Sequence, residues 1–185
     1  MALWLLGAGA GGWYLVRRTL SSFGTSSSAY VKRQGRQLLL GGQPYRFMGV
    51  NRYNLLTVAQ PEYAGYRGCG EPWSRSELAT WFAELRTMNV KAVRFWAFQR
   101  FTASGQDWNR LDYVLSLCGK YGMKAIPVLE NQWAACTEGD TKYFTWYRGG
   151  YLHPYGAYPI SFKQYVGMVA TRYRTNPNIL MWQLM

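Results

Sequence analysis

The chain has 185 residues, of which 49% are hydrophobic and 17% aromatic, so it can build a core and its composition argues against disorder. Its 21 Lys and Arg outnumber nine acidic residues, giving a formal net charge of +12, but the basic residues are spread singly and no recognised nucleic-acid motif is present. One histidine and three widely spaced cysteines form no metal-binding signature.

The sequence of residues 1–18 is typical of a signal or membrane-anchor segment. The uncharged run MALWLLGAGAGGWYLV is followed at once by Arg17 and Arg18. The run is short for a membrane span of about 20 residues but suits a signal h-region or a short anchor. Because the positive charge follows the apolar run instead of preceding it, the run belongs either to a longer leader or to an anchor whose basic side stays in the cytoplasm. A buried N-terminal helix is less favoured, because 19–28 is a Ser- and Gly-rich linker.

Residues 29–185 read as one domain. Its first part, 29–47, has short strand patterns separated by Gln34-Gly35 and by Gly41-Gly42, which is typical of a hairpin. We expect this hairpin to close the base of the domain. The segment 45–51, YRFMGVN, is a strand candidate and leads into a long loop rich in Tyr and Gly.

A helix and a second strand follow that loop. Ser74 and Glu77 have the spacing of a capping box at the start of the helix. The strand candidate at 90–98, VKAVRFWAF, is apolar at nearly every position except Arg94. The helix places its apolar residues on one stripe, namely Leu78, Trp81, Phe82, Leu85 and Met88.

The next unit is a helix that Asp107 is expected to cap and Gly122 to end. A third strand is predicted at 123–131, MKAIPVLEN. Pro127 removes a hydrogen-bond donor that a central strand needs, but the flanks and the order of elements still favour a strand. The apolar stripe of the helix consists of Leu111, Val114, Leu115 and Cys118.

A third helix and a fourth strand complete the pattern after the long loop 131–158. Ser161 and Gln164 again have capping-box spacing. The run 179–185, ILMWQLM, predicts a strand that is buried on both faces of a parallel sheet. The helix stripe consists of Phe162, Tyr165, Val166, Val169, Ala170 and Tyr173.

Alternating strands and helices predict an α/β protein with a parallel sheet, either doubly wound or a (β/α)8 barrel. No Gly-rich phosphate motif follows a strand, and the long aromatic loops lie where a barrel builds its site, so we favour the barrel. A complete barrel needs about 250 residues. We therefore expect a partial (β/α)8 TIM barrel of about four strands and three helices, preceded by a β-hairpin and an N-terminal apolar leader.

Four stretches carry a resemblance to a known family: GQPYRFMGVNRYNL, LRTMNVKAVRFWAFQRF, RLDYVLSLCGKYGMKAIPVLENQW and YRTNPNILMWQLM. Over about residues 30–185 the chain resembles glycoside hydrolase family 5, especially its bacterial endo-β-1,4-mannanases and cellulase-like members. The resemblance implies an acid/base Glu in an Asn-Glu pair directly after the last stretch and a nucleophile Glu from the seventh strand. Both would lie beyond Met185, so the chain is expected to be an inactive N-terminal half.

The resemblance also implies a role for Arg94, which would orient the nucleophile carboxylate; the alternative is a buried ion pair with a local acid such as Glu130. Retaining hydrolysis requires two carboxyl groups about 5 to 5.5 Å apart, and among the nine acidic residues only Glu130 occupies a strand end. Trp96 shares the strand face of Arg94 and would line the sugar site or pack in the core. The expected substrate-binding residues are Asn51, Trp96, Glu130, Asn131 and Trp133.

The loop 131–158 holds aromatic residues that would stack on pyranose rings or pack the loop itself. His153 is expected to cap the loop. Many family members carry His near the end of the third strand, where this chain has ENQW, so mannan versus glucan stays open. Cys69 and Cys136 lie in loops on one face of the predicted fold, and an exported protein could join them. The loop aromatics are Trp133, Tyr143, Trp146, Tyr147, Tyr151 and Tyr155.

We therefore expect a fragment of a retaining glycoside hydrolase that acts on a β-1,4-linked polysaccharide, β-mannan first and β-glucan next. It would need no metal or cofactor, would not bind nucleic acid, and would be secreted or membrane-anchored and extracellular. A non-catalytic carbohydrate-binding or cell-wall-associated surface protein is the alternative. A basic nucleic-acid binder is a third possibility, and the net charge is its only support.

Overall fold

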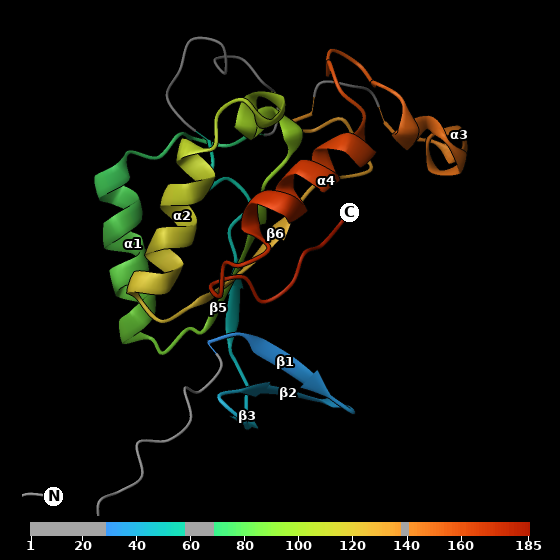
Figure 1. Ribbon diagram of the computed structural model, residues 1–185. Helices are drawn as coiled ribbons and strands as arrows, with labels where there is room; N and C mark the ends of the chain where they lie inside the picture. The colour runs from blue at the N-terminus through green and yellow to red at the C-terminus, as the bar shows by residue number, and fades with distance from the viewer. Residues whose placement is uncertain (1–28, 58–68, 138–140) are drawn as a thin grey trace, which may run out of the picture.

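The computed structural model describes residues 29–57, 69–137 and 141–185, so the predicted leader 1–18 and the linker 19–28 lie outside the described residues. An antiparallel sheet of order β1-β2-β3 lies below a parallel sheet of order β4-β5-β6 (Figure 1). The strands are β1 (Val31–Gln34), β2 (Gln37–Leu40), β3 (Gln43–Pro44), β4 (Gly49–Asn51), β5 (Ala92–Trp96) and β6 (Lys124–Val128). The helices are α1 (Arg75–Thr87), α2 (Asn109–Lys120), α3 (Phe144–Arg148) and α4 (Phe162–Tyr173), with 3-10 turns η2 (Gln99–Gly105) and η3 (Gly150–Leu152).

Side chains alternate between the two faces of the parallel sheet, as its backbone geometry requires. On β5, Val93 and Phe95 are buried in the core with the helices, whereas Arg94 and Trp96 are only partly buried on the other face. The parallel register places Asn51 of β4 opposite Arg94. The face turned away from the helices therefore presents Asn51, Arg94, Trp96, Ile126 and Val128.

The helices begin where side chains can satisfy their first backbone N–H groups. Both predicted capping boxes form: Ser74 Oγ accepts from the backbone N–H of Glu77 at 3.1 Å, and Ser161 Oγ accepts from that of Gln164 at 3.2 Å. Gly122 follows α2 with a φ of 71°, the left-handed conformation expected after a helix end. Among the described residues, none of the helices has the length and apolar character needed to cross a membrane.

Three details of the predicted helices are wrong, and the first is Ala170, which was predicted on the apolar stripe of α4 but is exposed. The cap of α2 is Trp108 and makes no side-chain capping bond, whereas Asp107 lies one residue further out and accepts from the backbone N–H of Asn109 at 2.9 Å. Met88, predicted on the buried stripe of α1, is 54% exposed because the helix ends at Thr87 and Met88 is its C-cap. The remaining predicted stripe residues of α1 and α2 are buried or packed against the core.

The segment 179–185 lies beside β6 but pairs with it only through isolated bridges at Ile179 and Gln183. Pro127 explains the interruption. The backbone N–H of Ala125 donates to the carbonyl of Asn178, and its carbonyl accepts from Leu180. Pro127, two residues on, has no N–H and only accepts from Gln183, at 3.0 Å. The missing donor faces this segment and not β5, so β6 keeps its regular pairing with β5.

The prediction of a fourth strand buried on both faces is therefore wrong. Met181 is 45% exposed and Leu184 is 54% exposed. No further strand or helix of the described residues covers this segment, so its apolar side chains reach solvent (Figure 1). The parallel sheet of the described residues does not close into a barrel. The α/β class and the parallel order are confirmed, and the structure holds partial sheets.

Candidate active site

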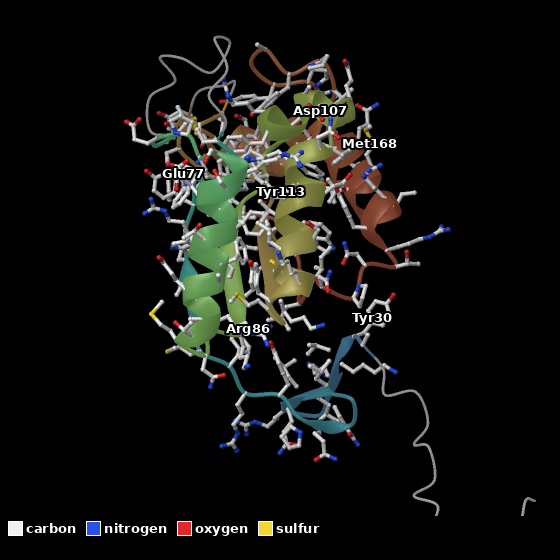
Figure 2. The ribbon with its side chains drawn as sticks, turned by 90° about the vertical axis from the view of Figure 1, so that its left-hand side faces the viewer. Tyr30, Glu77, Arg86, Asp107, Tyr113 and Met168 are labelled. Atoms are coloured by element: carbon white, nitrogen blue, oxygen red, sulfur yellow. A yellow bond between two sulfur atoms is a disulfide. The ribbon has the colours of Figure 1, made fainter. Side chains whose placement is uncertain are left out.

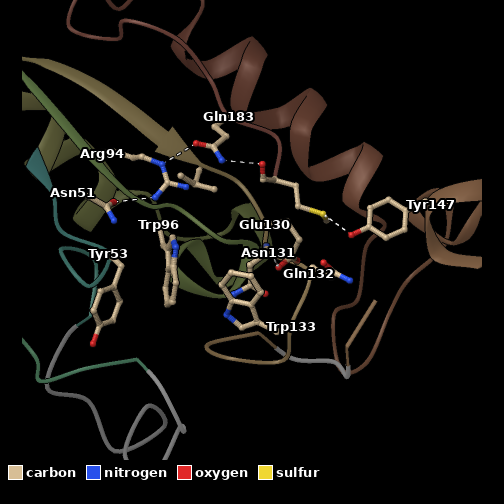
Figure 3. Close-up of a pocket in the computed structure, with 12 residues that line it drawn as sticks. Asn51, Tyr53, Arg94, Trp96, Glu130, Asn131, Gln132, Trp133, Tyr147 and Gln183 are labelled. Carbon is tan, nitrogen blue, oxygen red and sulfur yellow. Dashed lines mark hydrogen bonds between the residues drawn. The ribbon is translucent and has the colours of Figure 1, made fainter. Parts of the chain in front are cut away.

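A cleft of about 520 Å³ opens at the carboxyl ends of β4, β5 and β6 (Figure 3). Parallel strands bring the residues at their carboxyl ends to one edge of the sheet, which is where α/β proteins build their sites. All the site residues predicted from the sequence line this one cleft, although their roles are not settled by that placement. They are Asn51, Arg94, Trp96, Glu130, Asn131 and Trp133.

Arg94 projects from β5 into the cleft and is held by two neutral amides (Figure 3). Its Nε donates to Oε1 of Gln183 at 2.8 Å, and its Nη1 donates to Oδ1 of Asn51 at 2.9 Å. The alternative pairing of Arg94 with Glu130 does not form, since the ion pair of Glu130 is with Lys142. Among the described residues no carboxylate pairs with Arg94, so its charge and its remaining N–H groups are available to the cleft.

Gln183 is a site residue that the sequence reasoning missed. It lies in the apolar run 179–185, where its only signal is that it is the one polar residue. The bridge between Val128 and Gln183 places it beside the end of β6. Its amide bonds Arg94 through Oε1 and the carbonyl of Met185 through Nε2 at 2.8 Å. It therefore fixes the Arg94 guanidinium from the side opposite to Asn51.

Aromatic rings form a wall and a rim of the cleft. Trp96 packs between Tyr53 and Phe98, with ring centroids 4.7 Å and 4.9 Å away. Trp133, which is 56% exposed, and Tyr147, which is 45% exposed, line the cleft from the loop after β6 and from α3. Such exposed rings offer flat apolar surfaces to a ligand. Tyr147 was among the loop aromatics expected either to stack on sugar rings or to pack the loop, whereas Tyr53 was not predicted as a cleft residue.

The other loop aromatics do not line the cleft. Trp146 is 6% exposed and packs on Tyr151 and Phe162, so it serves the loop itself. Tyr143 is exposed but is not one of the residues that line the cleft. His153 is exposed after η3 and does not line the cleft either.

Glu130, at the floor of the cleft, is the only acid among the described lining residues. It is 2% exposed, and its Oε1 lies 3.3 Å from Nζ of Lys142 and accepts the backbone N–H of Asn131 at 2.9 Å. Burial raises the pKa of Glu130, and the charge of Lys142 acts against that rise. Lys142, which the sequence reasoning also missed, has its pKa lowered by burial.

The other described acids serve helices and loops. Glu77 closes the capping box of α1, and Asp112 binds Arg172 and Tyr173 on the helices. Glu62, Glu138 and Asp140 lie outside the described residues. The described part of the cleft therefore holds one carboxylate, already paired, and lacks the two that retaining hydrolysis uses.

A disulfide joins the two loops that border the cleft. Cys69 follows β4 and Cys136 follows β6; their Cα atoms are 5.0 Å apart and both residues are buried. The hydroxyl of Thr57 donates to the carbonyl of Cys69 at 2.8 Å, which ties the same loop to the core. The pairing that the sequence left open is therefore present. Cys118 is buried in the core, as predicted.

The chain is similar to curated mannan-degrading enzymes over most of its length. It is 28% identical over 183 residues to mannan endo-1,4-beta-mannosidase 1 of Oryza sativa subsp. japonica, covering 84% of this chain and 40% of that protein. It is 25% identical over 185 residues to probable mannan endo-1,4-beta-mannosidase F of Neosartorya fischeri, covering 86% of this chain and 37% of that protein. The resemblance to glycoside hydrolase family 5 is confirmed. No protein-family model matches the sequence.

The fold is also similar to that of a solved endocellulase. An endocellulase from Pyrococcus horikoshii, crystallised as a variant with cellotetraose, aligns with a TM-score of 0.51 at 12% identity and covers 83% of this chain and 42% of that one. At this identity the likeness concerns the fold alone. The chain spans about two fifths of the length of the two curated relatives.

Proposed function

We propose that this chain forms the amino-terminal part of a retaining glycoside hydrolase that cleaves β-1,4-linked polysaccharide, with β-mannan as the first candidate substrate. The observation that carries the proposal is Arg94. It lies in the middle of the parallel strand β5 and lines the cleft, held by Asn51 and Gln183, with no carboxylate of the described residues to neutralise it. The similarity to mannan endo-1,4-beta-mannosidases over 84% of the chain supports the choice of substrate.

The chemistry assigns complementary tasks to these residues. One carboxyl group must be protonated to expel the leaving oxygen, and the other must be ionised to attack the anomeric carbon. The planar guanidinium of Arg94 would hydrogen-bond the attacking carboxylate and keep it ionised and aligned. We propose that both catalytic Glu come from polypeptide beyond Met185. Glu130 is not proposed as one of them, because Lys142 already neutralises it.

The rim of the cleft would hold the sugar. The C–H face of a pyranose matches an aromatic ring, and Trp133 and Tyr147 present exposed rings there. Asn51 and Asn131 would bond sugar hydroxyls. The Oδ1 atom of Asn131 is buried without a hydrogen-bond partner in the protein, while its Nδ2 donates to the carbonyl of Ala135 at 2.8 Å. An unsatisfied buried acceptor favours a ligand or water with a hydroxyl to donate.

A β-glucan is the second candidate substrate. The fold is similar to an endocellulase crystallised with cellotetraose, and the ENQW sequence departs from the usual pattern at the end of the third strand. The disulfide between Cys69 and Cys136 supports an exported protein, secreted or anchored outside the cell, because disulfides persist in oxidising compartments.

A non-catalytic carbohydrate-binding protein is the alternative function. It is favoured by one observation, namely that the described cleft has an aromatic rim and no pair of carboxylates. Such a protein would bind the same sugars without cleaving them.

Titration calorimetry with mannohexaose and cellohexaose tests the binding proposal on the 185-residue chain. We expect mannohexaose to bind more tightly and neither sugar to be cleaved. The full-length polypeptide that carries these residues should hydrolyse mannan, and Arg94→Lys should lower its kcat by about 10²-fold or more with a smaller change in KM. A full-length polypeptide that binds mannan without cleaving it would establish the alternative, and cleavage by the 185 residues alone would refute the proposed source of the carboxylates.

A further inference from the structure

The described acidic side chains gather toward the cleft end of the structure, whereas basic side chains occur at both ends. The parallel strands run from the base of the molecule to the cleft, and α1 and α2 run the opposite way, so both helices begin near the cleft end (Figure 1). Figure 2 shows Glu77 and Asp107 at the upper end and Arg86 toward the lower end. Glu130 and Glu71 also belong to the cleft end. Glu84, on the third turn of α1, is the described acid nearest the base.

The base carries cations without acids. Residues 29–57 include no Asp or Glu, and Lys32, Arg33 and Arg36 all lie on the hairpin of β1 and β2. Neighbouring residues of a strand point to opposite faces, so Lys32 and Arg33 put a cation on each face, while Arg36 follows the turn at Gly35. We define the base surface as Lys32, Arg33, Arg36, Arg46 and Arg86, all of which are exposed.

The cations of the base surface have no carboxylate partner among the described residues, since none of the five has one within ion-pair distance. Near the cleft, by contrast, Arg52 lies over the Trp73 ring at 5.0 Å and Arg110 donates to three backbone carbonyls. An uncompensated cluster of like charge is a surface for a polyanion.

Exposed apolar side chains among these cations indicate which kind of polyanion the base surface fits. Tyr30 is 40% exposed, Phe47 is 37% exposed and Met48 is 57% exposed, and each neighbours the hairpin or the start of β4. Basic residues mixed with exposed aromatic and aliphatic ones match the headgroup region of a bilayer, which offers both phosphate and hydrocarbon. A nucleic acid or an acidic glycan would use the charge and leave the methionine without a partner.

We propose that the base surface binds the anionic phospholipid headgroups of a membrane. Chain length is compatible with this site. The uncharged run ends at Val16 and β1 begins at Val31, so the chain between them spans at most roughly 50 Å even when fully extended. Any membrane contact of that run keeps the hairpin within reach of the same bilayer. A protein docked in this way presents its cleft on the side away from the lipid.

Vesicle co-sedimentation of the full chain tests the proposal. Vesicles of phosphatidylcholine alone are compared with vesicles that also contain phosphatidylglycerol. Each cation near an anionic bilayer strengthens binding roughly fivefold, so the variant Lys32→Gln/Arg33→Gln/Arg36→Gln should bind the anionic vesicles roughly 100-fold more weakly. Raising the salt concentration should weaken binding of the unchanged chain in the same direction.

A matched control removes three exposed cations from the cleft end, in the variant Arg52→Gln/Arg148→Gln/Lys163→Gln. Its net charge equals that of the hairpin variant, and it should keep nearly full binding to anionic vesicles. Equal losses in the two variants would overturn the proposal in favour of net charge alone. If the chain bound phosphatidylcholine vesicles as tightly as anionic vesicles, the proposal would be overturned in favour of binding through the apolar run 1–16. If it bound heparin or duplex DNA more tightly than anionic vesicles, the proposal would be overturned in favour of another polyanion. Circular dichroism melts should change little in either variant, because all six side chains are exposed and the contacts of Arg52 with Trp73 and of Arg148 with Phe144 are weak at exposed sites.

Discussion

The Nζ atom of Lys142 lies 3.3 Å from Oε1 of Glu130, and the two side chains are only 2% and 3% exposed. Lys142 is further enclosed by aromatic rings, with the centroids of Trp146 and Tyr155 5.6 Å and 5.4 Å from Nζ. The backbone N–H of Lys142 donates to the carbonyl of Gln132 at 2.7 Å. A buried charge pair therefore fastens the aromatic loop to the end of β6, beside the cleft.

Breaking this pair should be costly. The variant Glu130→Gln leaves an unpaired buried ammonium, and we expect it to lower the free energy of unfolding by about 3 to 5 kcal/mol. The double variant Glu130→Gln/Lys142→Met removes both charges and should recover most of that loss. Urea unfolding of the single and double variants measures the coupling. The exposed pair Arg172–Asp112 is the control: Arg172→Gln should cost less than about 1 kcal/mol. Equal costs for Glu130→Gln and Arg172→Gln would contradict the buried-pair account.

Reduction of the disulfide should destabilise the chain. Cys69 and Cys136 are 67 residues apart in sequence, so the bond closes a long loop in the unfolded chain. The variant Cys69→Ser/Cys136→Ser should lose about 2 to 5 kcal/mol of unfolding free energy. Thermal melts with and without dithiothreitol measure the effect. The melting temperature of the double variant should not depend on dithiothreitol. If dithiothreitol also left the melting temperature of the unchanged chain the same, the disulfide would not be stabilising the protein.

Trp133 should contribute more to sugar binding than Tyr143. Trp133 lines the cleft at 56% exposure, whereas Tyr143, 71% exposed, lies on the same loop outside it. We expect Trp133→Ala to weaken mannohexaose binding about tenfold, on the order of 1.4 kcal/mol. Tyr143→Ala should leave the affinity unchanged. Titration calorimetry compares the two variants, and similar losses in both would place the sugar outside the cleft.

The capping box of α1 should make stability depend on acid pH. Hydrogen bonds from the side chain and the backbone of Ser74 lower the pKa of Glu77 from its ordinary 4.5. A carboxyl whose pKa is lowered on folding stabilises the protein above its unfolded pKa and loses that contribution as the pH falls through the folded value. Glu77→Ala should therefore melt below the unchanged chain at pH 7, with the difference shrinking under acid conditions below about pH 4.5.

The control for the capping box is Glu84→Ala on the same helix, since the Glu84 side chain takes no part in a cap. Its melting temperature should follow that of the unchanged chain across the same pH range. A Glu77→Ala deficit that stayed constant from neutral to acid pH would rule out the carboxylate as its source.

Local patterns in the sequence predicted much of the fold and of the cleft. A capping box needs only two residues three positions apart, and both boxes form. The placement of Arg94 and Trp96 on one face follows from the twofold period of a strand. The carboxyl ends of parallel strands then bring Asn51 and Glu130 to the same edge.

The features that the sequence did not reveal depend on long-range contacts. Lys142 lies in a long loop, and nothing in its neighbours indicates that it will be buried against Glu130. Gln183 looks like an interruption in an apolar strand until Arg94 is placed beside it. The exposure of Met181 likewise depends on whether another element covers the segment, which no local pattern encodes.

The two bonds of Arg94 have a consequence for how the protein is made. They join residues separated by 43 and 89 positions, and the more distant partner, Gln183, is translated after α1, α2 and α4. Long loops close slowly because their entropy must be lost before the contact forms. Until Gln183 has been synthesised, the Arg94 guanidinium can bond only Asn51 of these two partners. Its second hydrogen bond forms after the helices have been translated. Slowed elongation near codon 183 should therefore delay assembly of this centre without delaying formation of α1 and α2.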